Sequence, residues 1–197
     1  MTGHHTITAT LPHHAREHPD RIAVVCDTHT ITWRELDRAV NRLAAHLAGI
    51  VPVGRGVALH LPNGPALVLL YLAAARAGRE AQILDPNWPT EPTRMALAEL
   101  SPGLVVSHDA APAGAADALI TIDPHALFGA VAEAIGARDA FAAVPEPDPL
   151  TPFYVGFTSG STGVPKGYRR HHLSWVESFR AGDREFDIGA NDVILAP

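Results

Sequence analysis

The chain has 197 residues, of which 47% are hydrophobic and 6% aromatic, and its formal net charge at pH 7 is −6. This length can bury a core and suits one or two domains, whereas the acidic balance argues against a nucleic-acid-binding surface. Cys26 is the only cysteine, so no disulfide can form within the chain. The longest apolar run, 66–75, is too short for a membrane span, and the N-terminus lacks a signal-peptide pattern, so we expect a cytoplasmic protein.

In chain order, the first predicted elements are a short helix, a β-hairpin and a longer helix. Two β-branched runs, 22–26 and 30–32, flank a polar turn and predict the hairpin. Thr32, with Glu35 three positions later, forms the sequence pattern of a capping box, which indicates a helix start. The two helices are expected at 7–18 and 33–48.

Strands and helices then alternate along the chain. The predicted strands are 57–61, 80–84, 104–107 and 119–122, and the predicted helices are 66–77, 91–100 and 124–136. Such alternation indicates right-handed crossovers between parallel strands. The predicted fold class is therefore α/β, with a parallel-rich β-sheet flanked by helices.

A segment with prolines at alternate positions, 145–149, interrupts this pattern. Alternate prolines keep a chain extended, and we expect the acidic side chains between them to lie in solvent. We interpret 145–150 as a linker between an α/β subdomain, 1–144, and a second part, 151–197. The elements predicted in that second part are strands at 153–157 and 168–171, a helix at 172–179, and the start of a strand at 192–195.

The most informative stretch follows strand 153–157 and reads Thr-Ser-Gly-Ser-Thr-Gly-Val-Pro-Lys-Gly over residues 158–167. Glycines let the backbone approach a ligand, while backbone N–H groups, hydroxyls and a lysine together form a cradle for phosphate. The Walker pattern fails because Pro165 and Gly167 flank the lysine, and the dinucleotide fingerprint is absent from this stretch. The predicted phosphate-binding residues are Thr158, Ser159, Gly160, Ser161, Thr162, Gly163 and Lys166. They would position a leaving group, so no catalytic nucleophile and no metal ligand is assigned among them.

This stretch closely resembles the phosphate-loop signature of the adenylate-forming enzymes, namely acyl-CoA synthetases, luciferases and peptide-synthetase adenylation domains. Their signature reads Thr-Ser-Gly-Ser/Thr-Thr-Gly-x-Pro-Lys-Gly and matches at every fixed position. Two earlier blocks, 31–36 and 74–86, resemble further family passages in the same order. The sequence departs from the family at Arg79, Glu80 and Gln82, where small apolar residues are usual, and in the bulky run 168–170, which leaves the local packing open.

The resemblance implies the N-terminal part of the large N-terminal domain of an ATP-dependent ligase. Such an enzyme joins a carboxylic acid to AMP with release of pyrophosphate and then forms a thioester. The implied cofactors and co-substrates are ATP, Mg²⁺ and coenzyme A, and the implied function includes fatty acid metabolism. The family's adenine, ribose and magnesium ligands are not found in this sequence, so we expect the isolated chain to be inactive and to need the remaining part of the enzyme.

Two alternatives remain open at this point. One is a peptide-synthetase adenylation domain, whose acceptor is a carrier protein, and the other is a non-catalytic nucleotide-binding or interaction module. We expect exposed apolar surface at 192–195, and therefore self-association or docking to a complementary fragment.

The remaining polar and aromatic candidates have simpler interpretations. We expect Arg169 and Arg170 to be surface residues rather than phosphate ligands. His14 and His18 have the i,i+4 spacing of metal ligands but no further ligand motif, so we interpret them as a solvated helix face. His172 could lie near a substrate or pack at a helix start. The tryptophans are expected to be packing residues, although Trp175 could face an acyl site.

Overall fold

The computed structural model describes residues 5–26, 29–108, 112, 119–121, 144–158, 166–189 and 191–194. The predicted helix 124–136 lies outside these residues. The described elements are α1 (Leu11–Glu17), β1 (Ile22–Cys26), β2 (His29–Thr32), α2 (Trp33–Ile50), β3 (Val57–His60), α3 (Pro65–Arg76), β4 (Ala81–Ile83), α4 (Thr90–Leu100), β5 (Leu104–Ser107), β6 (Leu119–Thr121), β7 (Pro152–Thr158), β8 (Lys166–His171) and α6 (His172–Phe186).

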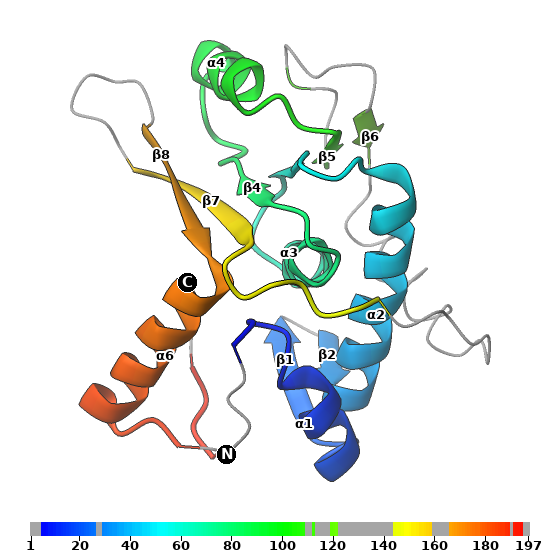
Figure 1. Cartoon of the computed structure of the whole chain (residues 1–197), viewed down its shortest axis with the longest axis vertical. Coiled ribbons are helices and arrows are strands. Elements are labelled where there is room, and N and C mark those ends of the chain that lie inside the picture. The colour runs from blue at the N-terminus through cyan, green and yellow to red at the C-terminus, as the bar shows by residue number, and fades with distance from the viewer. Residues whose placement is uncertain are drawn as a thin grey trace.

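A six-stranded sheet in the order β6-β5-β3-β4-β7-β8 forms the framework. The first five strands of this order pair in parallel, and β8 pairs antiparallel with β7 at the edge. Strands β1 and β2 form a separate antiparallel hairpin beside α1 and α2 (Figure 1). The predicted α/β fold with a parallel-rich sheet is therefore confirmed.

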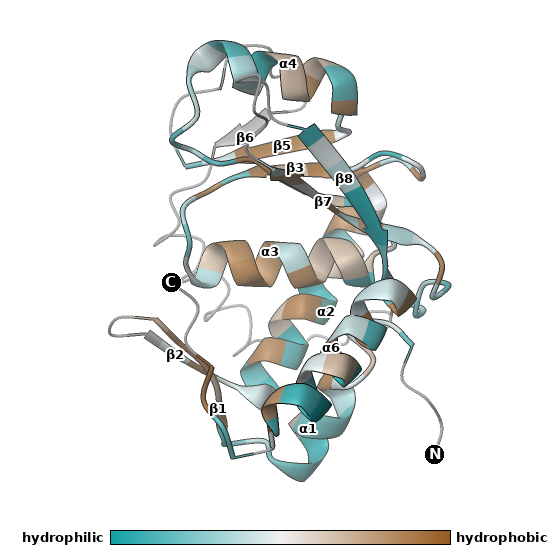
Figure 2. Ribbon diagram, turned by 90° about the vertical axis from the view of Figure 1, so that its left-hand side faces the viewer, coloured by the Kyte–Doolittle hydropathy of each residue, from teal (hydrophilic) through white to brown (hydrophobic). Residues whose placement is uncertain are grey.

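Helices cover both faces of this sheet. Figure 2 shows α3 and α2 below the sheet and α4 above it. Side chains alternate along β3 accordingly, because successive residues of a strand point to opposite faces. Val57 and Leu59 belong to the core with α2 and α3, whereas Ala58 packs in the cluster that contains α4 residues.

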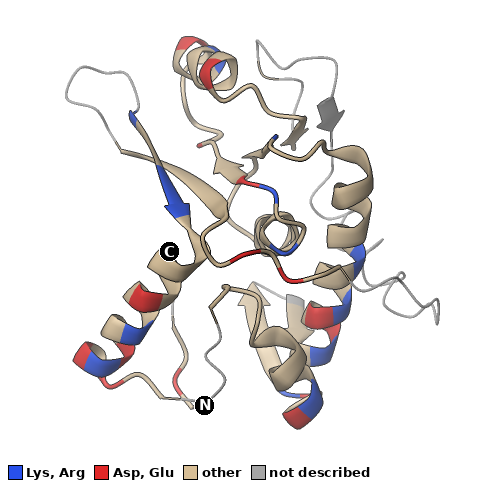
Figure 3. Ribbon diagram, in the orientation of Figure 1, with Lys and Arg blue, Asp and Glu red and all other residues tan. Residues whose placement is uncertain are grey.

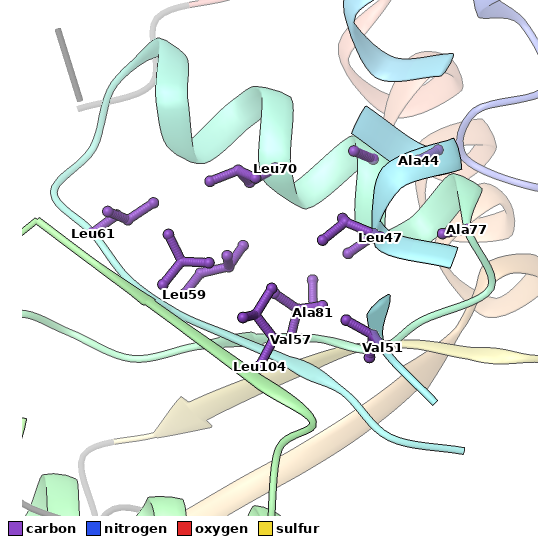
Figure 4. Packing of buried hydrophobic residues seen from close by; sticks show 13 residues of the cluster. Ala44, Leu47, Val51, Val57, Leu59, Leu61, Leu70, Ala77, Ala81 and Leu104 are labelled. Atoms are coloured by element: carbon purple, nitrogen blue, oxygen red, sulfur yellow. The ribbon is translucent and has the colours of Figure 1, made fainter. Parts of the chain in front are cut away.

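The main core lies between the sheet and α3 (Figure 4). Leu59 and Leu69 are fully buried, and α3 is apolar nearly all round because it packs against both the sheet and α2. Burying each such leucine stabilises the fold by about 1.5–3 kcal/mol. This core holds β3, β4 and β5 in place, and β7 pairs with β4 at the side of this group.

Helix α2 begins at the predicted capping box. The Glu35 N–H donates to Thr32 Oγ1 at 3.3 Å, and the Thr32 N–H donates to Glu35 Oε2 at 2.8 Å. The helix runs two residues further than the predicted 33–48, because Val51, which caps it, is buried and bonds back to the Leu47 carbonyl.

Arg79, one of the departures from the family pattern, is buried where two helices end. Its guanidinium donates to the carbonyls of Ala48 and Val51 at the end of α2 and to that of Ala77 at the end of α3. Carbonyls at a helix C-terminus lack intrahelical partners and carry partial negative charge, so a cation there satisfies them. Arg79 therefore joins α2 and α3, which small apolar residues could not do.

The proline-rich segment differs from expectation at Glu146. Its carboxylate forms an ion pair with Arg76 of α3 and accepts hydrogen bonds from the hydroxyls of Thr6 and Thr8. Arg76, Thr6 and Thr8 are buried, whereas the Glu146 side chain stays 37% exposed, so the expected solvent exposure holds and only its ion pair was not predicted. A carboxylate extends over α3 here because a buried guanidinium requires an opposite charge.

The C-terminal elements also differ in part from those predicted from the sequence. Helix α6 continues to Phe186, beyond the predicted 172–179. The predicted strand 192–195 is wrong for its described residues, since Asp192, Val193 and Ile194 are irregular and unpaired with any described strand. A β conformation needs a partner strand for its backbone hydrogen bonds. Among the described helices, none is both long enough and apolar enough to cross a membrane.

Candidate functional site

The candidate site is the mouth of the β7–β8 hairpin. Thr158 is the last residue of β7, Lys166 is the first residue of β8, and the two are cross-strand partners. The Thr158 hydroxyl donates to the Lys166 carbonyl at 3.5 Å, and both side chains are exposed. The predicted loop therefore starts at the carboxyl end of its strand. The other predicted phosphate-binding residues, Ser159, Gly160, Ser161, Thr162 and Gly163, lie outside the described part of the chain.

The hairpin mouth lies at the sheet edge where the parallel strands end. In open α/β sheets, ligands bind outside the carboxyl ends of the strands. The carboxyl ends of β3 and β5 meet at the same edge, where the His60 Nδ1 and Ser107 Oγ atoms are 3.1 Å apart and buried. Sequence reasoning did not single out this pair, although Ser107 ends the predicted strand 104–107 and His60 is the residue before the end of the predicted strand 57–61.

Arg169 and Arg170 both bind other groups of the protein, which agrees with the expectation that they are not phosphate ligands. Arg169 Nε donates to Glu80 Oε1 at 2.8 Å across the sheet. Arg170 donates to the Ser174 hydroxyl and carbonyl and to the Ser178 hydroxyl. Its guanidinium also lies 5.1 Å from the centre of the Trp175 ring. Lys166 is the cation of β8 that lies nearest to the loop (Figure 3). It has no ion-pair partner among the described residues.

His172 packs at the start of α6, which is one of its two predicted roles. Its ring stacks on Phe153 of β7 with ring centres 4.5 Å apart, and its Nδ1 accepts the Ile7 N–H at 3.4 Å. The side chain is fully buried, and its Nε2 has no hydrogen-bond partner. Burial, with a smaller contribution from the neighbouring His171, lowers the pKa of His172 to about 4, so the ring is neutral at pH 7.

Trp175 belongs to an aromatic cluster that joins α3, β7, β8 and α6. Its ring contacts Tyr154 at 4.8 Å and Phe153 at 5.8 Å between centres, and Tyr154 contacts Tyr168. A Cβ atom at Gly156 would lie 2.3 Å from the Tyr154 hydroxyl, so glycine is required for this ring to lie along the strand. Burial raises the pKa of Tyr154 above its usual range, so its hydroxyl stays protonated. The default interpretation of Trp175 as a packing residue fits these contacts.

The histidines of α1 have aromatic neighbours. The His14 ring stacks on Trp33 with ring centres 4.5 Å apart and meets His13 edge-on. In the part of the chain that the structure describes, no three His, Cys, Asp or Glu side chains gather as a metal site.

The comparisons with known proteins agree on one family. A family model described as AMP-binding enzyme matches residues 11–197. The chain belongs to the AMP-binding enzyme family. It is 34% identical to the uncharacterized acyl-CoA ligase YhfT of Bacillus subtilis, over 98% of this chain and 39% of that protein. It is 35% identical to the phosphinothricin tripeptide synthetase PhsC of Streptomyces viridochromogenes, over 86% of this chain and 16% of that protein.

A solved structure shows the same fold. The complex of VinN with L-aspartate matches with a TM-score of 0.83 at 24% identity, over 95% of this chain and 49% of that chain. The chain thus spans half or less of the lengths of these relatives. The expected adenylate-forming family and its N-terminal α/β fold are confirmed, and both acyl-CoA ligases and peptide synthetases are among the relatives.

Proposed function

We propose that this chain is the N-terminal part of an ATP-dependent ligase that activates a carboxylic acid. A carboxylate oxygen attacks the α-phosphorus of ATP, the bond to the bridging oxygen of the β-phosphate breaks, and pyrophosphate leaves. A thiol, that of coenzyme A in our proposal, then attacks the acyl carbon and releases AMP. The observation that carries the proposal is the ten-residue signature 158–167, whose two ends pair at the carboxyl edge of a parallel sheet.

The residues of the hairpin would bind the phosphates that leave. The Thr158 hydroxyl and the exposed Lys166 ammonium are donors at the two stems, and the hydroxyls and backbone of 159–163 would complete the cradle. A Lys166 charge near the β- and γ-phosphates would stabilise the negative charge that develops on pyrophosphate. Mg²⁺ takes oxygen ligands, and no carboxylate cluster of the described residues competes for it, so it would enter on the phosphate oxygens.

The acceptor is the less constrained half of the proposal. The similarity to YhfT, which covers nearly the whole chain, favours coenzyme A. The similarity to PhsC supports the second candidate, a peptide-synthetase adenylation domain with a carrier-protein acceptor. A pyrophosphate-exchange assay with fatty, aromatic and amino acids, using the chain joined to its remaining part, identifies the acid that is adenylated. Thioester formation from that acid with coenzyme A or with a carrier protein then separates the two acceptors.

The isolated 197-residue chain should not support that exchange, because the family's adenine and ribose contacts are not found in its sequence. Robust ATP-dependent exchange by the chain alone contradicts this part of the proposal.

Phosphate binding can be tested directly because Lys166 is the only lysine in the sequence. An amine-reactive acylating reagent will modify Lys166 and the α-amino group, and mass spectrometry can quantify each. We expect MgATP and inorganic tripolyphosphate to slow modification of Lys166, whereas adenosine does not, because the contact is to phosphate. The α-amino group is the internal control. Equal protection by adenosine, or none by either phosphate compound, contradicts the assignment.

The Lys166→Ala variant tests the same contact by activity in the complete enzyme. Loss of a hydrogen bond to a charged group costs about 1.5–3 kcal/mol, and this should appear in the use of ATP rather than of the acid. Arg184→Ala, which removes a cation on α6 instead, is the matched control. An unchanged apparent constant for ATP and unchanged turnover would falsify the role of Lys166.

A further inference from the structure

The loop after β4 contacts the hairpin from the neighbouring strand. Trp88 lies in this loop, at the carboxyl edge of the sheet, and its half-buried ring meets the Phe157 ring of β7 edge-to-face. The ring centres are 5.0 Å apart and the planes are inclined by 84°. This is the favoured geometry of an aromatic pair, and it joins two segments that are 69 positions apart in the sequence.

Phe157 in turn contacts β8, the other strand of the hairpin. It is the cross-strand partner of Gly167, one pair before Thr158 and Lys166. A Cβ atom on Gly167 would lie 3.2 Å from Phe157 Cε1, so the ring packs directly on the glycine backbone. The Trp88 ring therefore contacts the residue pair that directly precedes Thr158 and Lys166 in the hairpin.

Trp88 is itself held in place from the β4 side. Asp85 Oδ1 accepts hydrogen bonds from the Asn87 N–H at 2.8 Å and from Asn87 Nδ2 at 3.1 Å. The Trp88 N–H donates to the Asp85 carbonyl at 3.1 Å, which completes a turn. Two residues later α4 begins, and the Trp88 ring packs against the cluster that contains Leu97. The turn and this packing thus fix the position of the Trp88 ring against the hairpin.

We infer that Trp88 is a positioning residue that sets the separation of the two hairpin stems, and through them the placement of Thr158 and Lys166. It does not touch the nucleotide in this arrangement and acts through Phe157 and Gly167. Its effect on nucleotide binding rests on the proposed function, whereas its effect on the hairpin does not.

Hydrogen exchange without nucleotide tests the effect on the hairpin. We expect Trp88→Ala to speed exchange of the amides in peptides 152–158 and 166–171 by up to about tenfold, which is the range of an aromatic pair of this geometry. Trp88→Phe retains a ring and should restore slow exchange. Trp33→Ala is the matched control, because Trp33 is also half-buried and stacked on one ring, that of His14, but at α2. Unchanged hairpin exchange in Trp88→Ala, or an equal increase in Trp33→Ala, overturns the inference.

Gly167→Ala provides a second route to the same conclusion if Trp88→Ala does not fold. The added methyl group requires the Phe157 ring to shift by a few tenths of an ångström away from the glycine backbone, so hairpin exchange should rise while Trp88 is intact. Slow exchange in this variant overturns the inference as well.

Titration with MgATP, followed by calorimetry, gives the readout that a purely structural role would not move. Trp88→Ala should weaken binding by up to about tenfold, Trp88→Phe should restore it, and Trp33→Ala should leave it unchanged. These titrations use the chain joined to its remaining part. If that protein binds no MgATP without substitution, the proposed function fails, and the exchange experiment still decides the role of Trp88. If binding is equal in all variants, the inferred link from Trp88 to Lys166 is wrong.

Discussion

Helices α3 and α6 contact the same two residues of β7 but are buried to very different extents. Tyr71 of α3 and Trp175 of α6 each meet the rings of Phe153 and Tyr154. Seven of the twelve residues of α3 are buried, whereas α6 buries one of its fifteen, His172. Helix α3 is therefore held by packing on two sides, whereas α6 is anchored at its first turns only.

The side chains of α6 explain where that anchoring stops. Trp175, Phe179 and Phe186 fall on one helical stripe by their spacing. Trp175 is packed on β7, but Phe179 is 55% exposed and Phe186 is 78% exposed. An aromatic stripe of this kind is costly in water, so this end of the molecule should be prone to association.

The largest effect expected from this comparison is in the α3 core. Leu59→Ala removes a fully buried side chain of β3 and should lower the free energy of unfolding by about 2–5 kcal/mol. Phe179→Ala on α6 should lower it by less than about 1 kcal/mol, because that ring already faces solvent in large part. Denaturant titration of both variants makes the measurement. A similar loss in the two would mean that α6 is packed as firmly as α3.

The next effect is expected at the buried cation that joins α2 to α3. Arg79→Ala leaves three carbonyls at the two helix ends without their donor and should cost about 1.5–3 kcal/mol of unfolding free energy. The matched control is Arg94→Ala, which breaks only an exposed pair with Glu91 and should cost well under 1 kcal/mol. Equal costs for the two arginines would show that the capping role of Arg79 is wrong.

A smaller, pH-dependent effect is expected where α6 is anchored. The His172 pKa is about 4 in the folded chain and near 6.5 when unfolded, so the unfolded chain binds the proton more readily between these values. The stability that the neutral ring provides is fully present above pH 6.5 and falls by roughly 1 kcal/mol per pH unit toward pH 4.

His172→Phe keeps a ring on Phe153 but cannot titrate, so comparison with it isolates this contribution. His171 is the titratable neighbour that opposes the charge, and Phe153 and the Ile7 N–H are the other groups facing the ring. Denaturant titrations of both proteins at pH 4.5 and pH 7 provide the check. If the difference in stability between them does not change with pH, the ring is not buried in the neutral form.

Substitutions on the α6 stripe are expected to change stability least. They should instead reduce self-association of the chain. The double variant Phe179→Ser and Phe186→Ser should unfold at nearly the same denaturant concentration as the unsubstituted chain, because both rings are exposed. Sedimentation velocity should show concentration-dependent association of the unsubstituted chain and less of it in the variant. A clean monomer at high concentration, with no binding of an apolar dye, would contradict this expectation.

Much of the fold followed from the sequence because the deciding interactions are short-range or repeated. The capping box needs only Thr32 and Glu35, and the alternation of strands with helices indicates parallel pairing without any knowledge of contacts. The family also followed from sequence, since the signature 158–167 is contiguous. In the candidate site, the position of Thr158 at the end of a strand was predicted for the same reason.

Only the tertiary structure decided which polar groups are buried and which apolar ones are not. Arg76 is buried and pairs with Glu146, 70 positions away, which stays partly exposed, and Arg79 is buried where two helix ends converge on it. Phe186, on the part of α6 beyond the predicted 172–179, faces solvent, and 192–194 cannot form a strand without a partner in the described chain. Burial and pairing depend on residues distant in sequence, and a local pattern carries no information about which of them will meet.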